Sequence, residues 1–347
     1  MESILAMDIG GGTQDILLWR RGQVFENSVK LVLPSPTRVM AARIRKAREQ
    51  RRPVHLAGWL MGGGPIGRAV SEHLEAGLRV SATARAAATL ADDLARVREM
   101  GVEIQDKPPA GALEITCGDL DLEGLQRLFD RFQVPAPQGM VVAACDHGYS
   151  PGFSNRRFRF QMWERFLAGG GALADLISQE PDASLTRLRE IQAQAPGALV
   201  MDTAAAALWG ALQDPQVARR ADEGLCIVNL GNMHTVGFLL RGQRVLGVYE
   251  HHTRLLDSAA LADQVQRFIA GELSNQEVFQ ARGHGCARLE EAPREVAGPV
   301  VITGPRRRLA QGLGWYTANP FGDVMLSGCF GLLAAAAKYW GLEPPEN

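Results

Sequence analysis

Short apolar segments alternate with longer segments of helical periodicity along most of this chain. An apolar run of about four to eight residues is typical of a buried strand, and apolar positions three or four residues apart are typical of a helix. The alternation predicts an α/β fold. We expect strands at residues 4–9, 15–20, 24–33, 54–59, 78–82, 140–144, 198–201, 225–230, 236–240, 245–249 and 300–303. We expect helices at residues 34–50, 87–100, 122–132, 203–212, 257–271 and 323–340.

The pattern weakens over residues 149–194. Several glycines and a proline interrupt it, and three arginines alternate with two phenylalanines between Arg156 and Phe160. Glycine and proline are the residues that most often break regular structure. We therefore expect an irregular functional segment or a domain junction here. Its arginines would grip an acidic substrate or a partner, or would belong to a surface loop.

Two stretches of the chain, residues 8–22 and 229–242, follow the same plan. Each has the end of an apolar strand, a glycine-containing turn, a second apolar strand ending in Arg, and a further turn with glycine. The repetition suggests two similar half-domains, each presenting a loop between two antiparallel strands. We expect the first domain at residues 1–195 and the second at 196–347.

Composition excludes several classes. The chain of 347 residues has 37 Lys and Arg against 38 Asp and Glu, which disfavours a general nucleic-acid binder. No stretch reaches the roughly 18 consecutive apolar residues of a membrane span, and the N-terminus lacks the basic start of a signal peptide. The five cysteines form no CxxC pair, which excludes a zinc ribbon and an iron–sulfur cluster with closely spaced ligands. We expect a cytoplasmic protein with reduced thiols.

The first glycine-rich loop carries the clearest chemistry. Asp8 ends a strand, and Gly10, Gly11, Gly12 and Thr13 follow it. Consecutive glycines leave backbone N–H groups uncovered, and such a nest of amides holds anions, most often phosphate oxygens. An aspartate beside it suits magnesium, which prefers oxygen ligands. The alternative is a plain glycine-rich hairpin, which would need fewer glycines.

This loop, Asp-Ile-Gly-Gly-Gly-Thr-Gln-Asp, resembles the first phosphate loop of the actin, Hsp70 and sugar-kinase superfamily of ATPases. Four further segments resemble that superfamily in the right order. Residues 201–207 resemble the first connecting helix and residues 227–231 the second phosphate loop. Residues 300–304 resemble the adenosine strand, and residues 319–331 resemble the closing connecting helix.

A narrower resemblance is to an uncharacterised family loosely labelled pyruvate formate-lyase activating enzyme-like. It rests on residues 5–8, 15–18, 62–65 and 145–148. Radical activating enzymes of that kind need three closely spaced cysteines for an iron–sulfur cluster. This chain has no such triplet, so the label does not predict its chemistry.

The superfamily resemblance implies two RNase H-like (actin-like ATPase) domains that clasp Mg-ATP between them, with the C-terminal helix packing back on the first domain. Asp8 and Asn229 would hold magnesium, and Asp202 would be the general base. The first loop, with Gln14, would cradle the phosphates from one side. The second loop would do so from the other side, and two further residues would border the adenosine. These cofactor-binding positions are Gly10, Gly11, Gly12, Thr13, Gln14, Gly231, Asn232, His234, Gly304 and Arg306.

Two departures from the superfamily pattern bear on activity. Asn229 stands where the second loop normally begins with Asp, so an oxygen ligand remains but a charge is lost. Gln14 stands where Thr is usual. We expect a Mg-dependent phosphotransferase or ATPase that acts on water or a small acceptor. The alternative is a nucleotide-gated activator or scaffold for a partner enzyme, with little turnover.

Other residues suggest substrate contacts. A second glycine cluster, which includes Gly63 and Gly64, precedes a helix and would either line the cleft or form a tight turn. Several histidines lie at strand ends, where they would meet a metal or an anionic substrate, or would be unrelated turn residues. The candidate substrate residues are Asp146, His147, Gly63, Gly64, His251 and His284. Convergence of the histidines would favour a metal- or substrate-binding enzyme that has lost ATP use.

Overall fold

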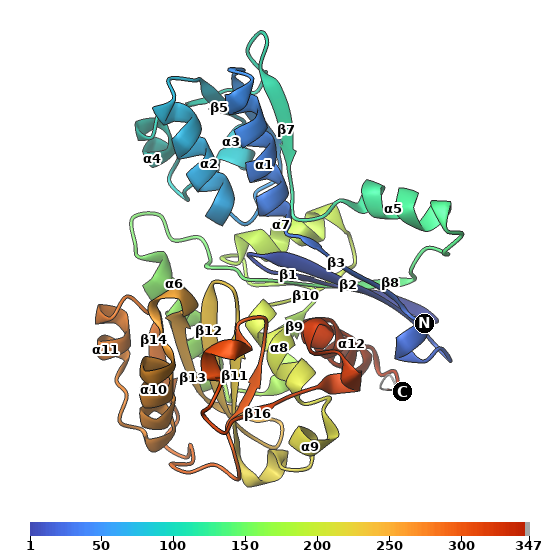
Figure 1. Ribbon diagram of the computed structural model, residues 1–347, viewed down its shortest axis with the longest axis vertical. Coiled ribbons are helices and arrows are strands. Elements are labelled where there is room, and N and C mark those ends of the chain that lie inside the picture. Colours follow the sequence, from blue (N-terminus) through green and yellow to red (C-terminus); the bar gives the residue numbers. More distant parts are fainter. Residues whose placement is uncertain (344–347) are drawn as a thin grey trace.

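The computed structural model describes residues 1–343. Its first sheet has six strands (Figure 1). In spatial order they are β3 (Val29–Pro34), β2 (Thr13–Arg20), β1 (Ser3–Ile9), β8 (Gly139–Ala144), β10 (Leu199–Met201) and β9 (Ile177–Ser178). β1, β2 and β3 form an antiparallel meander, and β8 and β10 continue the sheet parallel to β1.

The second sheet repeats this plan. In spatial order its strands are β14 (Gly285–Arg288), β13 (Arg244–His252), β12 (His234–Arg241), β11 (Leu225–Leu230), β15 (Val301–Thr303) and β16 (Tyr316–Thr317). β11, β12 and β13 form the meander, and β15 and β16 run parallel to β11. When the five core strands of each sheet are numbered in chain order, both sheets have the same spatial order, 3-2-1-4-5. This shared topology confirms the predicted fold class of two RNase H-like domains.

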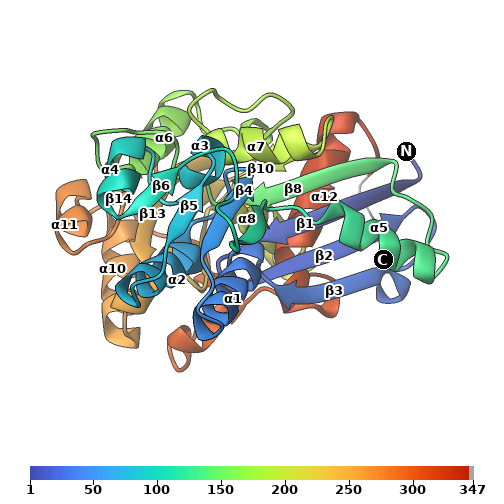
Figure 2. The same cartoon turned by 90° about the horizontal axis from the view of Figure 1, so that it is seen from above.

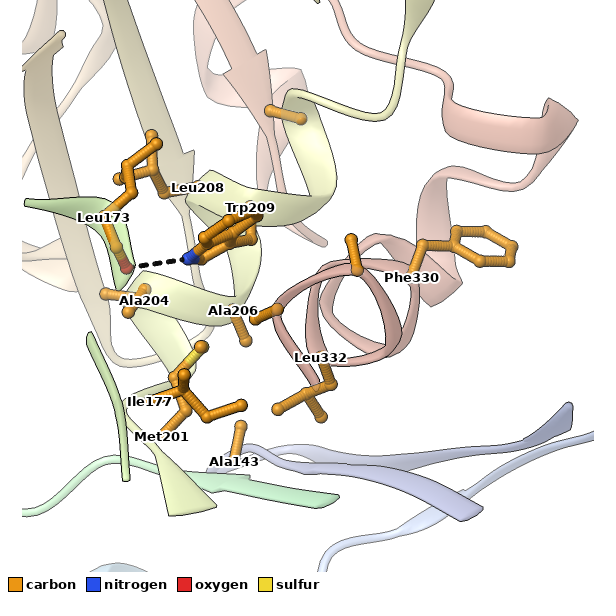
Figure 3. Close-up of a cluster of buried hydrophobic side chains, with 14 of the residues drawn as sticks. Ala143, Leu173, Ile177, Met201, Ala204, Ala206, Leu208, Trp209, Phe330 and Leu332 are labelled. Carbon is orange, nitrogen blue, oxygen red and sulfur yellow. Dashed lines mark hydrogen bonds between the residues drawn. The ribbon is translucent and has the colours of Figure 1, made fainter. Parts of the chain in front are cut away.

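Two buried helices pack against each other between the sheets. α8 (Thr203–Ala211) follows β10, and α12 (Ser327–Trp340) follows β16. Figure 3 shows them with side chains of the largest core cluster, which also includes residues of both sheets. A Cβ on Gly331 would lie 2.5 Å from the backbone nitrogen of Gly210, so the two helices meet at glycines. The C-terminal helix also contacts β1, β2 and β8.

Other helices cover the outer faces of the sheets. α5 (Leu122–Arg131) and α7 (Thr186–Gln194) bury apolar side chains against the outer face of the first sheet. α10 (Ser258–Ala270) does the same on the second sheet. Each apolar sheet face is therefore removed from water, which is the main stabilising contribution to the fold. Two shorter helices, α9 (Pro215–Ala218) and α11 (Asn275–Gln280), complete the second domain.

A separate unit is inserted between β3 and β8. Its parallel sheet has the order β6 (Val102–Ile104), β5 (Val80–Ala82), β4 (Val54–Gly58) and β7 (Leu113–Cys117). Its helices are α1 (Pro36–Glu49), α2 (Gly64–Glu75), α3 (Ala84–Ala87) and α4 (Leu94–Glu99). The unit has its own apolar core. Seen from above, it lies over one end of the first sheet, and α5 lies toward the other end (Figure 2).

Two predicted segments differ from the structure. Residues 87–100 do not form one helix, because α3 and α4 are separated by a turn. Residues 149–194 are not irregular, because they contain α7 and the long helix α6 (Asn155–Ala168). α6 buries Arg159 with Phe160, Trp163 and Leu167, so one of its core positions carries a charge that hides the apolar periodicity. β10 also extends the first sheet beyond the expected boundary at residue 195.

No helix within residues 1–343 combines the length and the apolar character needed to cross a membrane.

Candidate functional site

The carboxyl ends of β1, β8, β11 and β15 open into one cleft of about 510 Å³. Ligands commonly bind at the carboxyl ends of parallel strands, and this volume suits a small molecule. Both predicted phosphate loops line the cleft. The inserted unit supplies a third wall, in which Met61, Gly63 and Gly64 take part.

The two phosphate loops close in the same way. The N–H of Gly10 donates to the carbonyl oxygen of Thr13 at 2.9 Å, and the N–H of Gly231 donates to that of His234 at 2.9 Å. The repeat seen in the sequence is therefore also present in the backbone. In the part of the chain that the structure describes, the N–H groups of Gly11, Asn232 and Met233 donate to no protein acceptor, although these residues line the cleft. Free amides of this kind can bind an anion.

The two loops also touch each other. A Cβ on Gly11 would lie 2.6 Å from Cγ of Met233, and a Cβ on Gly12 would lie 2.9 Å from Cγ of Asn232. Glycine at both positions makes this close approach feasible. Side chains of the second loop therefore occupy part of the space between the loops, where the resemblance places phosphates.

An acidic pair lies beside the first loop. Asp8 is the last residue but one of β1 and lies directly opposite Asp15 on β2. The hydroxyl of Thr203 donates to Oδ1 of Asp8 at 2.6 Å. Burial, and next the charge of Asp15, raise the pKa of Asp8 to about 7. Burial also raises the pKa of Asp15 to about 6, against the lowering effect of the Thr13 hydroxyl and with a contribution from Asp323. Both carboxylates line the cleft and lack a cationic neighbour that would lower their pKa.

Asn229 and Gly304 lie together on the second domain. A Cβ on Gly304 would lie 2.6 Å from Oδ1 of Asn229, and the φ of Gly304 is +96°. A residue with a side chain would be strained at that φ and would collide with the amide. Both residues line the cleft.

Six predicted site residues do not line the cleft, namely Gly12, Gln14, Asp202, His251, His284 and Arg306. Three of them, Gln14, His251 and Arg306, belong neither to a loop contact nor to a side-chain cluster beside the cleft. Gln14 donates its side-chain amide to the carbonyl oxygen of Pro34 on the neighbouring strand. Arg306 is exposed and follows the adenosine strand without reaching the cleft. His251 is buried away from it, with Nδ1 3.2 Å from the carbonyl oxygen of His252. The structure therefore gives these three residues no contact with a ligand in the cleft.

Asp146 lines the cleft, but backbone groups hold its carboxylate. It accepts from the N–H of Gly148 at 2.8 Å and from that of Leu188 at 3.0 Å. Burial raises its pKa, and these two hydrogen bonds act in the opposite direction. Asp146 thus fixes the turn after β8, which positions His147.

Asp202 and Glu250 share the buried guanidinium of Arg159. Nη1 of Arg159 lies 2.7 Å from Oδ2 of Asp202, and Nε lies 2.8 Å from Oε1 of Glu250. Asp202 also caps α8 by accepting from the N–H of Ala204 at 2.9 Å. Its carboxylate is therefore fully engaged and does not line the cleft. This arrangement offers no support for the expected role of Asp202 as general base.

Four histidines and a cysteine meet at the domain interface. This histidine cluster consists of Cys145, His147, His234, His252 and His284. The ring centroids of neighbouring members are 4.7–5.5 Å apart. Cys145, His147 and His234 line the cleft, and His284 is only 1% exposed.

The members of the histidine cluster have divergent pKa values. Burial lowers the pKa of His284 to about 3 and that of His252 to about 4. Burial also lowers the pKa of His147. For His234, burial acts downward, but Cys145 and Glu250 together raise the pKa to about 10. One imidazolium is thus balanced by the Glu250 carboxylate, and the other rings are neutral.

Sequence reasoning missed Glu250 in this region, although it considered the arginines around Arg159 and the histidines at strand ends, which include His252. Cys145, Arg159, His252 and Glu250 were not among the predicted site residues, whereas His147, His234 and His284 were. Strand alternation would have identified two of them. Glu250 and His252 are two apart on β13 and share a face, and His251 points to the other face.

Comparison with solved structures gives low similarity over nearly the whole chain. An activator of the 2-hydroxyisocaproyl-CoA dehydratase from Clostridium difficile, with bound ADPNP, is 10% identical, with 99% of this chain and 100% of that chain covered and a TM-score of 0.36. A 2-dehydro-3-deoxygalactonokinase protein from Sinorhizobium meliloti is 13% identical, with 99% and 98% covered and a TM-score of 0.40. The ethanolamine utilization protein EutJ from Carboxydothermus hydrogenoformans is 10% identical, with 96% and 89% covered and a TM-score of 0.30.

Sequence comparison identifies one family. No curated protein matches this sequence. Residues 61–309, which include the second loop and the part of the inserted unit after β4, match the family described as "Putative pyruvate format-lyase activating enzyme (DUF1786)". The match covers well over half of the chain, and the chain belongs to this DUF1786 family.

Proposed function

We propose that this protein binds Mg-ATP in the cleft and transfers the terminal phosphoryl group to water or to a small acceptor. The observation that carries the proposal is the pair of equivalent loops. Both close with the same hydrogen bond, and both bring unpartnered backbone amides to one cleft between two RNase H-like domains. Such amides stabilise phosphate oxygens without a counter-charge from a side chain.

Asp8 and Asp15 fit a magnesium ion. Two buried carboxylates directly opposite each other repel, which is part of the reason that the pKa of Asp8 is raised. A divalent cation removes this repulsion, and carboxylate oxygens are ligands that magnesium accepts. Asn229 would add a neutral oxygen from the second domain. When bound, Mg-ATP supplies the phosphoryl group and the positive charge that offsets its oxygens.

Binding a phosphate chain requires a rearrangement of the second loop. The side chains of Asn232 and Met233 lie against Gly11 and Gly12. Met233 is 48% exposed, so its side chain can leave without creating a buried cavity. We infer that nucleotide binding displaces these two side chains, and that the Asn232 amide then faces the phosphates.

The chain's own residues then have simple roles. Thr203 fixes the orientation of Asp8 through its hydroxyl group. Gly328 leaves room for the same carboxylate, since a Cβ there would lie 2.7 Å from Cγ of Asp8. Because Arg159 holds Asp202, the cleft lacks a free carboxylate at the position expected for a general base. Positioning and charge neutralisation would therefore account for most of the rate enhancement.

The engaged state of Asp202 favours a second candidate function. A protein that binds ATP but lacks a free base would turn over slowly and act as a nucleotide-gated partner of another enzyme. In that case Mg-ATP would change which surface of the two domains is accessible. Phosphate release near the background rate with all small acceptors tested, together with nucleotide-dependent capture of one protein, would identify this role.

The activating-enzyme description of the family is not part of the proposal. Radical activating enzymes hold an iron–sulfur cluster with three cysteines. In residues 1–343, no group of potential metal ligands contains more than one cysteine. Four of the five thiols are buried and are distributed over three hydrophobic clusters, and Cys145 alone is partly exposed.

Calorimetric titration of Mg-ATP tests the proposal. Wild-type protein is expected to bind one Mg-ATP per chain, and Asp8→Asn is expected to weaken that binding at least about tenfold. Asp130→Asn, which changes an exposed carboxylate on α5, is the matched control and should bind like wild type. Absence of binding at millimolar Mg-ATP, or equal binding by Asp8→Asn, would refute a nucleotide site in the cleft.

A further inference from the structure

Three histidines on neighbouring segments face one point. His234 on β12 lies directly opposite His252 on β13, and His284 directly precedes β14, the strand that pairs with β13 on its other side. Their ring centroids are 5.1, 4.7 and 4.9 Å apart, and one nitrogen of each lies within 4.8 Å of the others. Two imidazoles bound to one tetrahedral zinc ion at about 2.0–2.1 Å have ring centroids roughly 5.2 Å apart. The observed spacing is thus close to that of a bound trio.

His284 supplies an independent observation. Its ring is 1% exposed, and neither Nδ1 nor Nε2 has a hydrogen-bond partner among the described residues. A buried ring nitrogen without a partner is unfavourable, and such groups in folded proteins normally have an explanation. A metal ion would use the lone pair of one nitrogen. We propose that His234, His252 and His284 bind one transition-metal ion of the zinc class.

Glu250 supports this assignment from behind the ligands. Its Oε1 lies 3.2 Å from Nδ1 of His234, and Arg159 and Trp163 fix the carboxylate through hydrogen bonds. A metal ion would displace the proton from Nε2 of the His234 imidazolium, while the Glu250 carboxylate accepts from Nδ1–H. A carboxylate in this position is the usual arrangement behind a metal-bound histidine. The hydrogen-bonded series Trp163–Glu250–His234 would therefore orient the His234 ring before a metal ion binds.

The trio borders the cleft through His234. Cys145 and His147 line the cleft, with the ring of His147 5.2 Å from that of His234. Three protein ligands and one accessible position are typical of catalytic zinc sites, where the fourth ligand is water or substrate. The site would take an anionic or water ligand from the cleft. Its nitrogen ligands select zinc, cobalt or nickel, whereas the oxygen ligands of Asp8 and Asp15 suit magnesium.

Metal content and cobalt binding test the proposal. The full chain, produced without a polyhistidine tag, is freed of metal by chelation and titrated with Zn²⁺ and Co²⁺ without nucleotide or magnesium. We expect one metal ion per chain and the visible absorption of tetrahedral Co²⁺. His252→Gln should lower the affinity at least about 100-fold, since it removes a ligand that is only partly buried. His284→Gln should do the same.

His251→Gln is the matched control, because His251 neighbours His252 on β13 but faces away from the trio. It should bind metal like wild type. A folded wild-type chain that binds no Co²⁺ at stoichiometric concentration would overturn the proposal, as would equal loss of affinity in His251→Gln and His252→Gln. A thiolate-to-cobalt charge-transfer band would contradict the three-histidine set by adding Cys145 to the ligands. None of these readouts depends on whether Mg-ATP binds.

Discussion

Asp8 and Asp15 lie directly opposite each other on β1 and β2, with their carboxylates on the same face of the first sheet. The pair lines the cleft, and the pKa values of about 7 and about 6 show that the fold gives these charges little compensation. A cation bound between these two carboxylates would remove their repulsion, so the folded protein favours cation binding at this cleft. This relationship leads to the first prediction.

Asp8→Asn should stabilise the protein in the absence of magnesium and nucleotide. The folded pKa of about 7 lies above the unfolded value of 3.8, so the folded state binds the extra proton, and wild-type stability falls as the pH rises through this range. The asparagine removes that loss and can still accept from Thr203. We expect a gain of about 1–2 kcal/mol at pH 8 and little gain near pH 4. Urea unfolding at both pH values provides the measurement, and a loss of stability at pH 8 would contradict the electrostatic account.

The contact between α8 and α12 should not tolerate a methyl group. In Gly331→Ala, the new Cβ would lie 2.5 Å from the nitrogen of Gly210 on the facing helix. Forcing two backbones apart costs about 1–3 kcal/mol. Gly67→Ala on α2 is the control, because nothing lies within 4 Å of its Cβ position. Alanine there should raise the free energy of unfolding by about 0.5–1 kcal/mol. Urea unfolding of the two variants should give changes of opposite sign.

Arg159 should be essential for stability. It is 2% exposed and balances Asp202 and Glu250, so Arg159→Met leaves two buried carboxylates without their cation. We expect a loss of about 3–5 kcal/mol. Arg79→Met removes an exposed pair with Glu103 and should cost less than about 1 kcal/mol. Similar unfolding midpoints for the two variants would show that the contacts of Arg159 with Asp202 and Glu250 do not stabilise the fold.

His73 should make stability depend on pH. Its ring is fully buried on α2, and burial lowers its pKa below the ordinary value of 6.5. The unfolded chain therefore takes up a proton that the folded chain rejects, and stability falls as the pH drops below about 6.5. His73→Leu should flatten this dependence. Thermal unfolding at pH 5 and pH 7.5 provides the comparison, and an unchanged slope in the variant would rule out this contribution of His73.

The hairpins and connecting helices were predictable because their signals are local. Glycines mark both turns, and alternating apolar residues mark the strands on either side. The alanine-rich run after Asp202 predicts α8 because small side chains allow close helix packing. These features depend on neighbours in the sequence, so they did not require knowledge of the tertiary structure.

The inserted unit and the histidine cluster were not predictable in the same way. The strands of the inserted unit have the same pattern as those of the main sheets, and only pairing shows that β4 belongs elsewhere. The predicted strand at 245–249 ended before Glu250, whereas β13 continues to His252. Without those three residues, alternation could not separate His252 from His251. The charge of Arg159 likewise concealed the buried face of α6.

The crystal structure of the complex with magnesium and a nonhydrolysable ATP analogue tests the central claim most directly. We expect the terminal phosphates to lie between Gly11 and Asn232, within hydrogen-bond distance of their backbone amides, with magnesium beside Asp8 and the Met233 side chain displaced. A nucleotide bound outside the cleft, or loops still in contact at saturating analogue, would contradict the account.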